Sequence, residues 1–250
     1  ASGLVVNMNK SAIWPIRCSH DEVDLVKTIM GCLTSAFPCT YLGLPLALRK
    51  QSAAQMQGLV DKVRDCLPYW KADLLPKSGW LISIQSVLCA IPVHSMLALS
   101  LPAKTLSALV KICRGFLWCG KSEAKGGNCS VAWDDVCTPK WAGGLGIPDL
   151  RWLNKALQAR WPWLQTANKE RSWAEFSIVV PPEAMALAQA AMRTTIGNGS
   201  AARFWEDRWV DGARICELAP TLYNSVPNQI RTTRMVSDAL CNGAWAGDVG

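Results

Sequence analysis

The stretch Trp133-Asp134-Asp135 places two carboxylates side by side after an aromatic residue. Adjacent carboxylates can neutralise two divalent cations and a transferring phosphate, which is the chemistry of metal-dependent phosphoryl transfer. The same two aspartates can instead begin a turn or a short helix. We favour this structural interpretation, and we expect neither a catalytic residue nor a metal ligand in this chain.

A second acidic cluster lies at Glu206, Asp207 and Asp211. A metal-dependent nuclease would combine this cluster with the paired aspartates. The competing interpretation is local ion pairing, because Arg203 and Arg208 share the segment.

The eleven cysteines and two histidines lack the spacing of a metal site. There is no CxxC, so a zinc site would need thiolates from scattered elements. We interpret the cysteines as reduced intracellular thiols that act as small core hydrophobes. Neither His20 nor His94 has the motif context of a hydrolase, and residues 197–199 lack the spacing of a phosphate-binding loop. We expect no small-molecule substrate.

The net positive charge is concentrated in the middle third of the chain. Lys and Arg outnumber Asp and Glu by 11 to 4 over residues 49–125, but they balance at 3 to 3 over 1–48 and at 12 to 12 over 126–250. Each cation that neutralises a phosphate releases condensed counterions, so this pattern favours a surface that faces a polyanion. A solvated basic surface without a partner would have the same composition.

Residues 79–103 contain no charged side chain. The stretch is long enough to cross a bilayer, which takes about 20 residues, but its serines, Gln85 and central Pro92 argue against insertion. At helical spacing its apolar residues form one stripe, which contains Leu81, Ile84, Leu88 and Ile91. We expect a buried helix that breaks near Pro92. The alternative is a helical protein-interaction or membrane-associated module that uses this stretch.

The remaining pattern is mostly helical. Ser19 and Glu22 form a capping box that predicts a helix of about four turns. Further helices are expected from Ser52 to near Pro68, from Pro102 through Leu117, from about Leu150 to Leu164, and from Pro182 to Met192. An extended segment is expected at residues 40–48 and a hairpin at 196–212. The expected fold class is α+β and mainly α-helical.

Six stretches, in order and at matching spacing, resemble the reverse transcriptase of plant LINE-type (non-LTR) retrotransposons. They are SGLVVNMNKS (2–11), YLGLPL (41–46), YWKADLLPKSGWLISIQSVLCAIPV (69–93), FLWCG (116–120), WDDVCTPKWAGGLGIPDL (133–150) and IGNGSAARFWEDRW (196–209). The resemblance covers nearly the whole chain. There are two departures: Gly79-Trp80 replaces the usual glycine-arginine, and Gln85 stands where lysine is common.

The resemblance implies a division into three parts. Residues 1–50 would be a palm remnant, 51–120 a helical thumb, and 121–250 a small mixed helical and hairpin linker before an absent zinc-binding module. In that family the first stretch follows the hairpin that carries the catalytic aspartates. The chain would therefore be a fragment of an RNA-directed DNA polymerase that is inactive alone and holds no cofactor, whereas the full-length family enzyme would use Mg²⁺.

The resemblance also gives the basic segment a partner. A thumb holds a template–primer duplex by its phosphates without reading bases, so we expect nonspecific binding of an RNA–DNA hybrid or duplex and no membrane. The candidate phosphate-binding residues are Lys62, Arg64, Lys71, Lys77, Lys104, Lys111 and Arg114. Asp61, Asp65 and Asp73 could pair with some of these cations. The implied location is intracellular, in the nucleus or cytoplasm.

Overall fold

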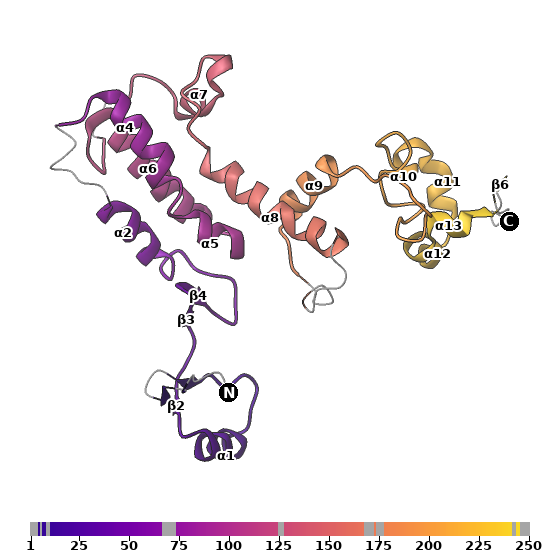
Figure 1. Cartoon of the computed structure of the whole chain (residues 1–250), viewed down its shortest axis with the longest axis horizontal. Coiled ribbons are helices and arrows are strands. Elements are labelled where there is room, and N and C mark those ends of the chain that lie inside the picture. Colours follow the sequence, from indigo (N-terminus) through magenta and orange to yellow (C-terminus); the bar gives the residue numbers. More distant parts are fainter. Residues whose placement is uncertain are drawn as a thin grey trace. The chain divides into compact units, whose positions relative to one another are not determined.

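The computed structural model describes residues 5, 7–8, 11–66, 74–124, 128–167, 173, 178–241 and 244–245 (Figure 1). Within these residues the fold is mainly helical and contains small two-stranded sheets. The expected α+β, mainly α-helical class is confirmed. The chain divides into two compact units, Ala1–Gln158 and Ala159–Gly250, and the division falls inside helix α8 (Leu150–Ala167).

The first unit begins with helix α1 (His20–Met30), which has the predicted capping box. The Ser19 backbone N–H donates to Glu22 Oε2 at 2.8 Å, and the Glu22 backbone N–H donates to Ser19 Oγ at 3.4 Å. Gly31 ends the helix with φ 63°, a conformation that glycine adopts without steric cost. Strands β1 (Ala12–Ile13) and β2 (Leu33–Thr34) flank the helix in sequence and pair in parallel.

The segment expected to be extended is a β-hairpin. Strands β3 (Cys39–Tyr41) and β4 (Leu44–Leu46) pair antiparallel, with Cys39 opposite Leu46. Leu42 and Gly43 form the turn with φ values of 49° and 79°. Two consecutive positive φ values are typical of a two-residue hairpin turn, so Gly43 reverses the chain here.

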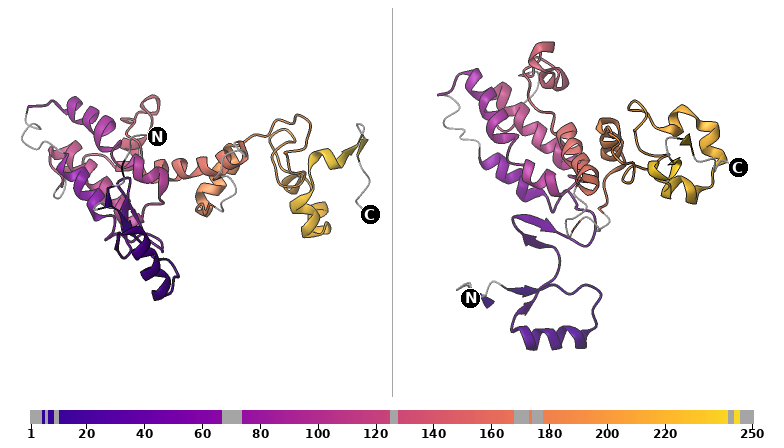
Figure 2. Two further views of the ribbon diagram at one scale, coloured as in Figure 1. Left: turned by 60° about the horizontal axis from the view of Figure 1, so that its bottom comes forward. Right: turned by 45° about the vertical axis from the view of Figure 1, so that its right-hand side comes forward.

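A helical core follows the hairpin. Its elements are α2 (Gln57–Asp65), α4 (Lys77–Ser83), the π-helix η2 (Ile84–Leu88), α5 (Val93–Ala98) and α6 (Ala103–Cys119). Helix α6 lies against α2, α4 and η2 (Figure 2). The α2 helix starts later than predicted, because Ser52 and Gln55 form a capping turn ahead of it.

The uncharged stretch folds largely as expected. The helical path is interrupted just before Pro92, and Ile84 and Leu88 of the predicted stripe are buried, while Leu81 and Ile91 pack against the core. The sequence did not indicate the π-turn at η2. No helix in the part of the chain that the structure describes has both the length and the apolar character needed to cross a bilayer.

The core of the first unit continues beyond residue 120. Trp133 and Val136 of α7 (Trp133–Cys137) are buried in the same cluster as Phe116 of α6, together with Ile147 and Leu150. A short 3₁₀ turn, η4 (Lys140–Ala142), lies between α7 and α8. Burial of one large apolar side chain contributes about 1.5–3 kcal/mol, so this shared core fixes α7 and the start of α8 against α6.

The second unit contains short helices around an aromatic cluster. They are α9 (Pro182–Ala191), α10 (Ile215–Leu218), α11 (Pro220–Ser225), α12 (Asn228–Thr233) and α13 (Val236–Ala239), followed by strands β5 (Leu240–Cys241) and β6 (Ala244–Trp245). Phe204 contacts both Trp205 and Trp209, at centroid distances of 5.0 and 5.4 Å.

The hairpin predicted at residues 196–212 is wrong. These residues form bends and turns, with isolated bridges from Arg203 to Met235 and from Val210 to Ala213. The Asn198 side chain accepts hydrogen bonds from the Ser200 backbone and hydroxyl, which closes a local turn. The aromatic residues then pack on one another instead of alternating across a strand.

Candidate nucleic-acid interface

Helix α6 carries a row of cations on its exposed side. Lys104, Lys111 and Arg114 are all exposed and are spaced by seven and three residues, which places them on one helix face. The opposite face holds buried residues, including Leu109 and Phe116. We call the three exposed cations the α6 basic face. The α6 basic face must point to solvent because the apolar face of the same helix is buried in the core.

The cations of the α6 basic face differ in their surroundings. Lys111 Nζ lies 3.2 Å from Glu123 Oε1, and both side chains are more than half exposed. The Arg114 guanidinium lies 5.8 Å from the centre of the Trp133 ring. Among the residues that the structure describes, no carboxylate pairs with Lys104 or Arg114. These two charges therefore remain available to an external anion.

The other predicted phosphate-binding residues lie on different elements. Lys62 and Arg64 are on α2, where Arg64 Nη1 bonds to Asp61 Oδ1 at 2.9 Å. Lys77 is exposed at the first residue of α4. Lys71 and Asp73 lie outside the described residues. The structure thus gathers Lys104, Lys111 and Arg114 on one face of α6, whereas the remaining described candidates lie on α2 and α4.

Gln85, which stands where lysine is common in the reverse transcriptases that the chain resembles, has a structural role. Its side-chain amide donates to the backbone carbonyls of Leu145 and Gly146, at 2.9 and 3.2 Å. This contact joins η2 to the segment that leads into α8.

A pocket opens beside the α6 basic face. It has a volume of about 340 Å³ and is lined by Ser107, Val110, Lys111, Arg114, Trp133, Asp134 and Arg151. Its walls therefore come from α6, α7 and the start of α8, all within the first unit. We call it the α6–α8 pocket. Trp133 is 6% exposed, and its indole Nε1 has no hydrogen-bond partner in the part of the chain that the structure describes.

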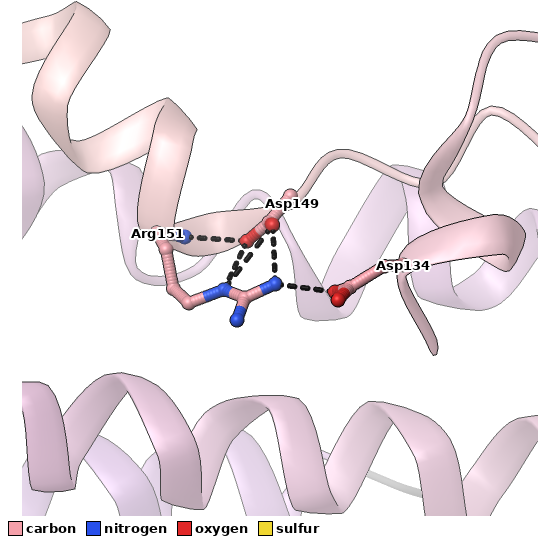
Figure 3. Close-up of polar contacts among 3 residues, drawn as sticks. All are labelled: Asp134, Asp149 and Arg151. Atoms are coloured by element: carbon pink, nitrogen blue, oxygen red, sulfur yellow. Dashed lines mark hydrogen bonds and ion pairs between the residues drawn. The ribbon is translucent and has the colours of Figure 1, made fainter. Parts of the chain in front are cut away.

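Arg151 joins α7 to α8 at the edge of this pocket (Figure 3). Its Nε and Nη2 donate to the Asp149 carboxylate at 3.0 and 2.7 Å, and Nη2 also donates to Asp134 Oδ1 at 2.5 Å. The Arg151 backbone N–H donates to Asp149 Oδ1 at 2.9 Å. Asp149 therefore both caps the start of α8 and orients the arginine.

The network shifts the proton affinities of its members. Burial by itself would raise the pKa of Asp149, but the hydrogen bonds from the Arg151 side chain and backbone outweigh it and lower that pKa. The hydrogen bonds to Asp149 and Asp134 raise the pKa of Arg151. Both members of the central pair are therefore held in their charged forms.

The acidic clusters do not form a magnesium site in the structure. Asp134 is paired with Arg151, whereas Arg203 in the other unit bonds to Glu206 at 3.1 Å and donates its backbone N–H to Asp207 at 2.7 Å. No group of three or more His, Cys, Asp or Glu side chains within the described residues is arranged to hold a metal ion. The described residues thus do not fit the Mg²⁺ that the resemblance implies for the full-length enzyme.

Three cysteines from distant segments, Cys89, Cys113 and Cys137, lie close to one another in the first unit. Cys89 and Cys113 are buried in the core, and the Cys89 side chain and burial raise the pKa of Cys113. Burial, with a further contribution from Asp149, raises the pKa of Cys137 to about 12. Cys113 and Cys137 are therefore neutral near pH 7 and pack as small apolar groups, whereas the hydrogen bond with Cys113 lowers the pKa of Cys89.

Comparisons with known proteins identify two relatives, both from Arabidopsis thaliana. One, named "Putative ribonuclease H protein", is 26% identical over 200 residues that cover 70% of this chain and 32% of the relative. The other, named "Uncharacterized mitochondrial protein", is 28% identical over 144 residues that cover 48% of this chain and 93% of the relative. The chain thus spans about a third of the first relative. No protein-family model matches the chain, and no solved structure matches it.

Proposed function

We propose that the chain is part of the reverse transcriptase of a plant LINE-type retrotransposon, and that residues 51–120 act as its thumb. Six ordered stretches that resemble this family support the proposal. Both relatives are plant proteins, and the name of one refers to a ribonuclease, a class of enzyme that acts on RNA. In this proposal the chain binds an RNA–DNA hybrid or duplex by its phosphates and does not extend a primer alone.

The observation that carries the proposal is the α6 basic face. Its ten-residue span from Lys104 to Arg114 corresponds to about 15 Å along a helix axis. One strand of a duplex carries about four phosphates over that length. The α6 basic face therefore matches a short run of backbone phosphates, which offers affinity without base recognition.

The proposal is tested by binding of a fluorescent 20-base-pair RNA–DNA hybrid to the full chain, measured by anisotropy over a range of salt concentrations. The test variant combines Lys104→Gln, Lys111→Gln and Arg114→Gln. Its plot of log affinity against log salt should be shallower by about 2 to 3, because each phosphate contact contributes about 0.9 to the slope.

A matched control removes three exposed cations elsewhere, through Lys27→Gln, Lys140→Gln and Arg193→Gln. This control has the same net charge as the test variant and should keep a slope close to that of the unmodified chain. Equal losses in the two variants would contradict a localised interface and would indicate a general effect of net charge.

The second candidate function is a helical protein-interaction module. It is favoured by Ile82 and Val87, which are 61% and 44% exposed within the uncharged stretch. Solubility that depends on detergent, and that the double variant Ile82→Ser/Val87→Ser relieves, would support it. Under the thumb proposal this double variant retains hybrid binding and its salt dependence.

A further inference from the structure

We propose that the α6–α8 pocket is a binding site for a single phosphate group. Two sources could supply it: the backbone of a nucleic acid, for which the inference rests on the proposed function, or a free phosphate compound. The proposal goes beyond the α6 basic face because it assigns roles to Trp133 and Arg151, which lie on α7 and α8.

The walls of the pocket are predominantly cationic. Lys111 and Arg114 line it from α6 and Arg151 from α8, and the one carboxylate in the lining is that of Asp134. Outside the lining, Glu123 pairs with Lys111 and Asp149 pairs with Arg151. Arg114 has no carboxylate partner within the described residues. Arg151 uses Nε and Nη2 for its two aspartates, and its remaining nitrogen, Nη1, bonds to no described residue. The guanidinium groups of Arg114 and Arg151 together offer several N–H donors, and a phosphate group has several oxygens that can accept from them.

A buried donor adds an independent indication of a ligand. The indole N–H of Trp133 can donate but cannot accept a hydrogen bond. Trp133 is 6% exposed and lines the pocket, and no described residue accepts a hydrogen bond from its Nε1. A buried polar group without a partner is uncommon and calls for an explanation. Because Nε1 is itself closed off from solvent, a phosphate oxygen would supply the missing acceptor after a small shift of the Trp133 ring or of the Arg114 guanidinium that lies over it.

Asp134 gives the site a distinctive charge balance. Its side chain is 77% exposed and bonds to Arg151 Nη2, so it competes with an incoming anion for that arginine. Neutralising Asp134 should therefore strengthen phosphate binding. A site for a metal cation would respond in the opposite way, because the same substitution would remove a ligand.

The test uses the full chain and two probes: inorganic phosphate, followed by calorimetry, and the fluorescent RNA–DNA hybrid. We expect saturable binding of inorganic phosphate that Arg114→Gln weakens about tenfold, the factor that corresponds to 1.4 kcal/mol. Trp133→Phe retains an aromatic ring, although a smaller one, and removes the donor, so it should weaken phosphate binding about threefold to tenfold. Asp134→Asn should tighten phosphate binding by a similar factor.

Lys104→Gln and Lys140→Gln serve as controls, since neither residue lines the pocket. Both should leave phosphate affinity unchanged, while Lys104→Gln should weaken hybrid binding. If Trp133→Phe and Asp134→Asn also shift hybrid affinity in their respective directions, the nucleic-acid backbone is the source. If they shift phosphate affinity alone, the pocket proposal holds with a free phosphate compound as the ligand.

Two results would overturn the pocket proposal. The first is the absence of saturable phosphate binding together with hybrid affinity that does not change in Trp133→Phe and Asp134→Asn. The second is weaker phosphate binding in Asp134→Asn with the fold retained by circular dichroism. Neither result affects salt-dependent binding of the hybrid through Lys104. A failure of the pocket proposal is therefore distinguishable from a failure of the proposed function, which would abolish that binding.

Discussion

The two ion pairs of Arg151 should contribute unequally to the stability of the first unit. Asp149 is 13% exposed and bonds to two side-chain nitrogens of Arg151, whereas Asp134 is 77% exposed and bonds to one. Exposed ion pairs contribute about 0–1 kcal/mol, and hydrogen bonds to charged groups about 1.5–3 kcal/mol. Since Arg151 is itself half exposed, we expect a coupling energy of about 1–2 kcal/mol with Asp149 and about 0.5 kcal/mol with Asp134.

Double-mutant cycles measure both couplings. The substitutions are Arg151→Gln, Asp149→Asn and Asp134→Asn, combined in pairs, with the free energy of unfolding taken from urea titration. Hydrogen exchange in peptides covering residues 133–158 follows the first unit separately from the second, which matters because the chain has two compact units.

The pH dependence of the larger coupling follows from the lowered pKa of Asp149. The stabilisation is present above the pKa of an unfolded aspartate, about 3.9, and it is lost as the pH falls through the lower folded value. The cycle should therefore give its full coupling at pH 7 and a declining one below pH about 4. Equal couplings for the two aspartates, or no loss in acid, would refute this account of the network.

Four further substitutions test the packing and the pH dependence of the first unit. In Gly115→Ala the new Cβ would lie 2.6 Å from the Glu123 backbone nitrogen, so the variant should melt at a lower temperature. In Gly58→Ala the new Cβ meets no atom within 4 Å, so this variant should stabilise α2 by about 0.5–1 kcal/mol. Phe116→Ala should cost about 3–5 kcal/mol in urea unfolding because Phe116 is fully buried. Folding raises the pKa of Cys137 to about 12, above the value of about 8.5 for an unfolded thiol. The resulting stabilisation of the folded state is present below pH about 8.5 and is lost as the pH rises towards 12. The free energy of unfolding of Cys137→Ala should lack this alkaline decline.

Local sequence signals predicted several elements of the first unit. The Ser19–Glu22 capping box, Pro102 before α6 and Pro92 near the break after η2 all act within one or two turns of the chain. The spacing of Lys104, Lys111 and Arg114 by seven and three residues likewise places them on one face of the helix that follows Pro102. Such features are readable because the residues that determine them are close in sequence.

The pocket could not be predicted in the same way. Arg151 meets Asp134 across 17 residues, and this contact depends on the packing of α7 and α8 into the core that contains Phe116. The core continues beyond residue 120 into α7 and the start of α8, and no local pattern in the sequence indicates this. A local signal was present in Asp149 and Arg151, an acid and a base two residues apart at the start of a helix, but its second partner is a tertiary contact.

The incorrect hairpin has a different cause. Its aromatic residues satisfied an extended pattern, but Phe204 instead packs against Trp205 and Trp209 within a compact turn. Side-chain packing overrode the alternation that predicts a strand. The convergence of Cys89, Cys113 and Cys137 was likewise hidden by their wide separation in sequence.

The most direct measurement of the central claim is lysine footprinting with an acetylating reagent, read by mass spectrometry with and without the RNA–DNA hybrid. Lys104 and Lys111 should lose reactivity when the hybrid is bound, because phosphates would cover the α6 basic face. Lys27 and Lys140, which are exposed elsewhere in the first unit, should react at unchanged rates. Uniform protection of all four lysines, or unchanged reactivity of Lys104 and Lys111 at saturating hybrid, would contradict a phosphate-binding thumb.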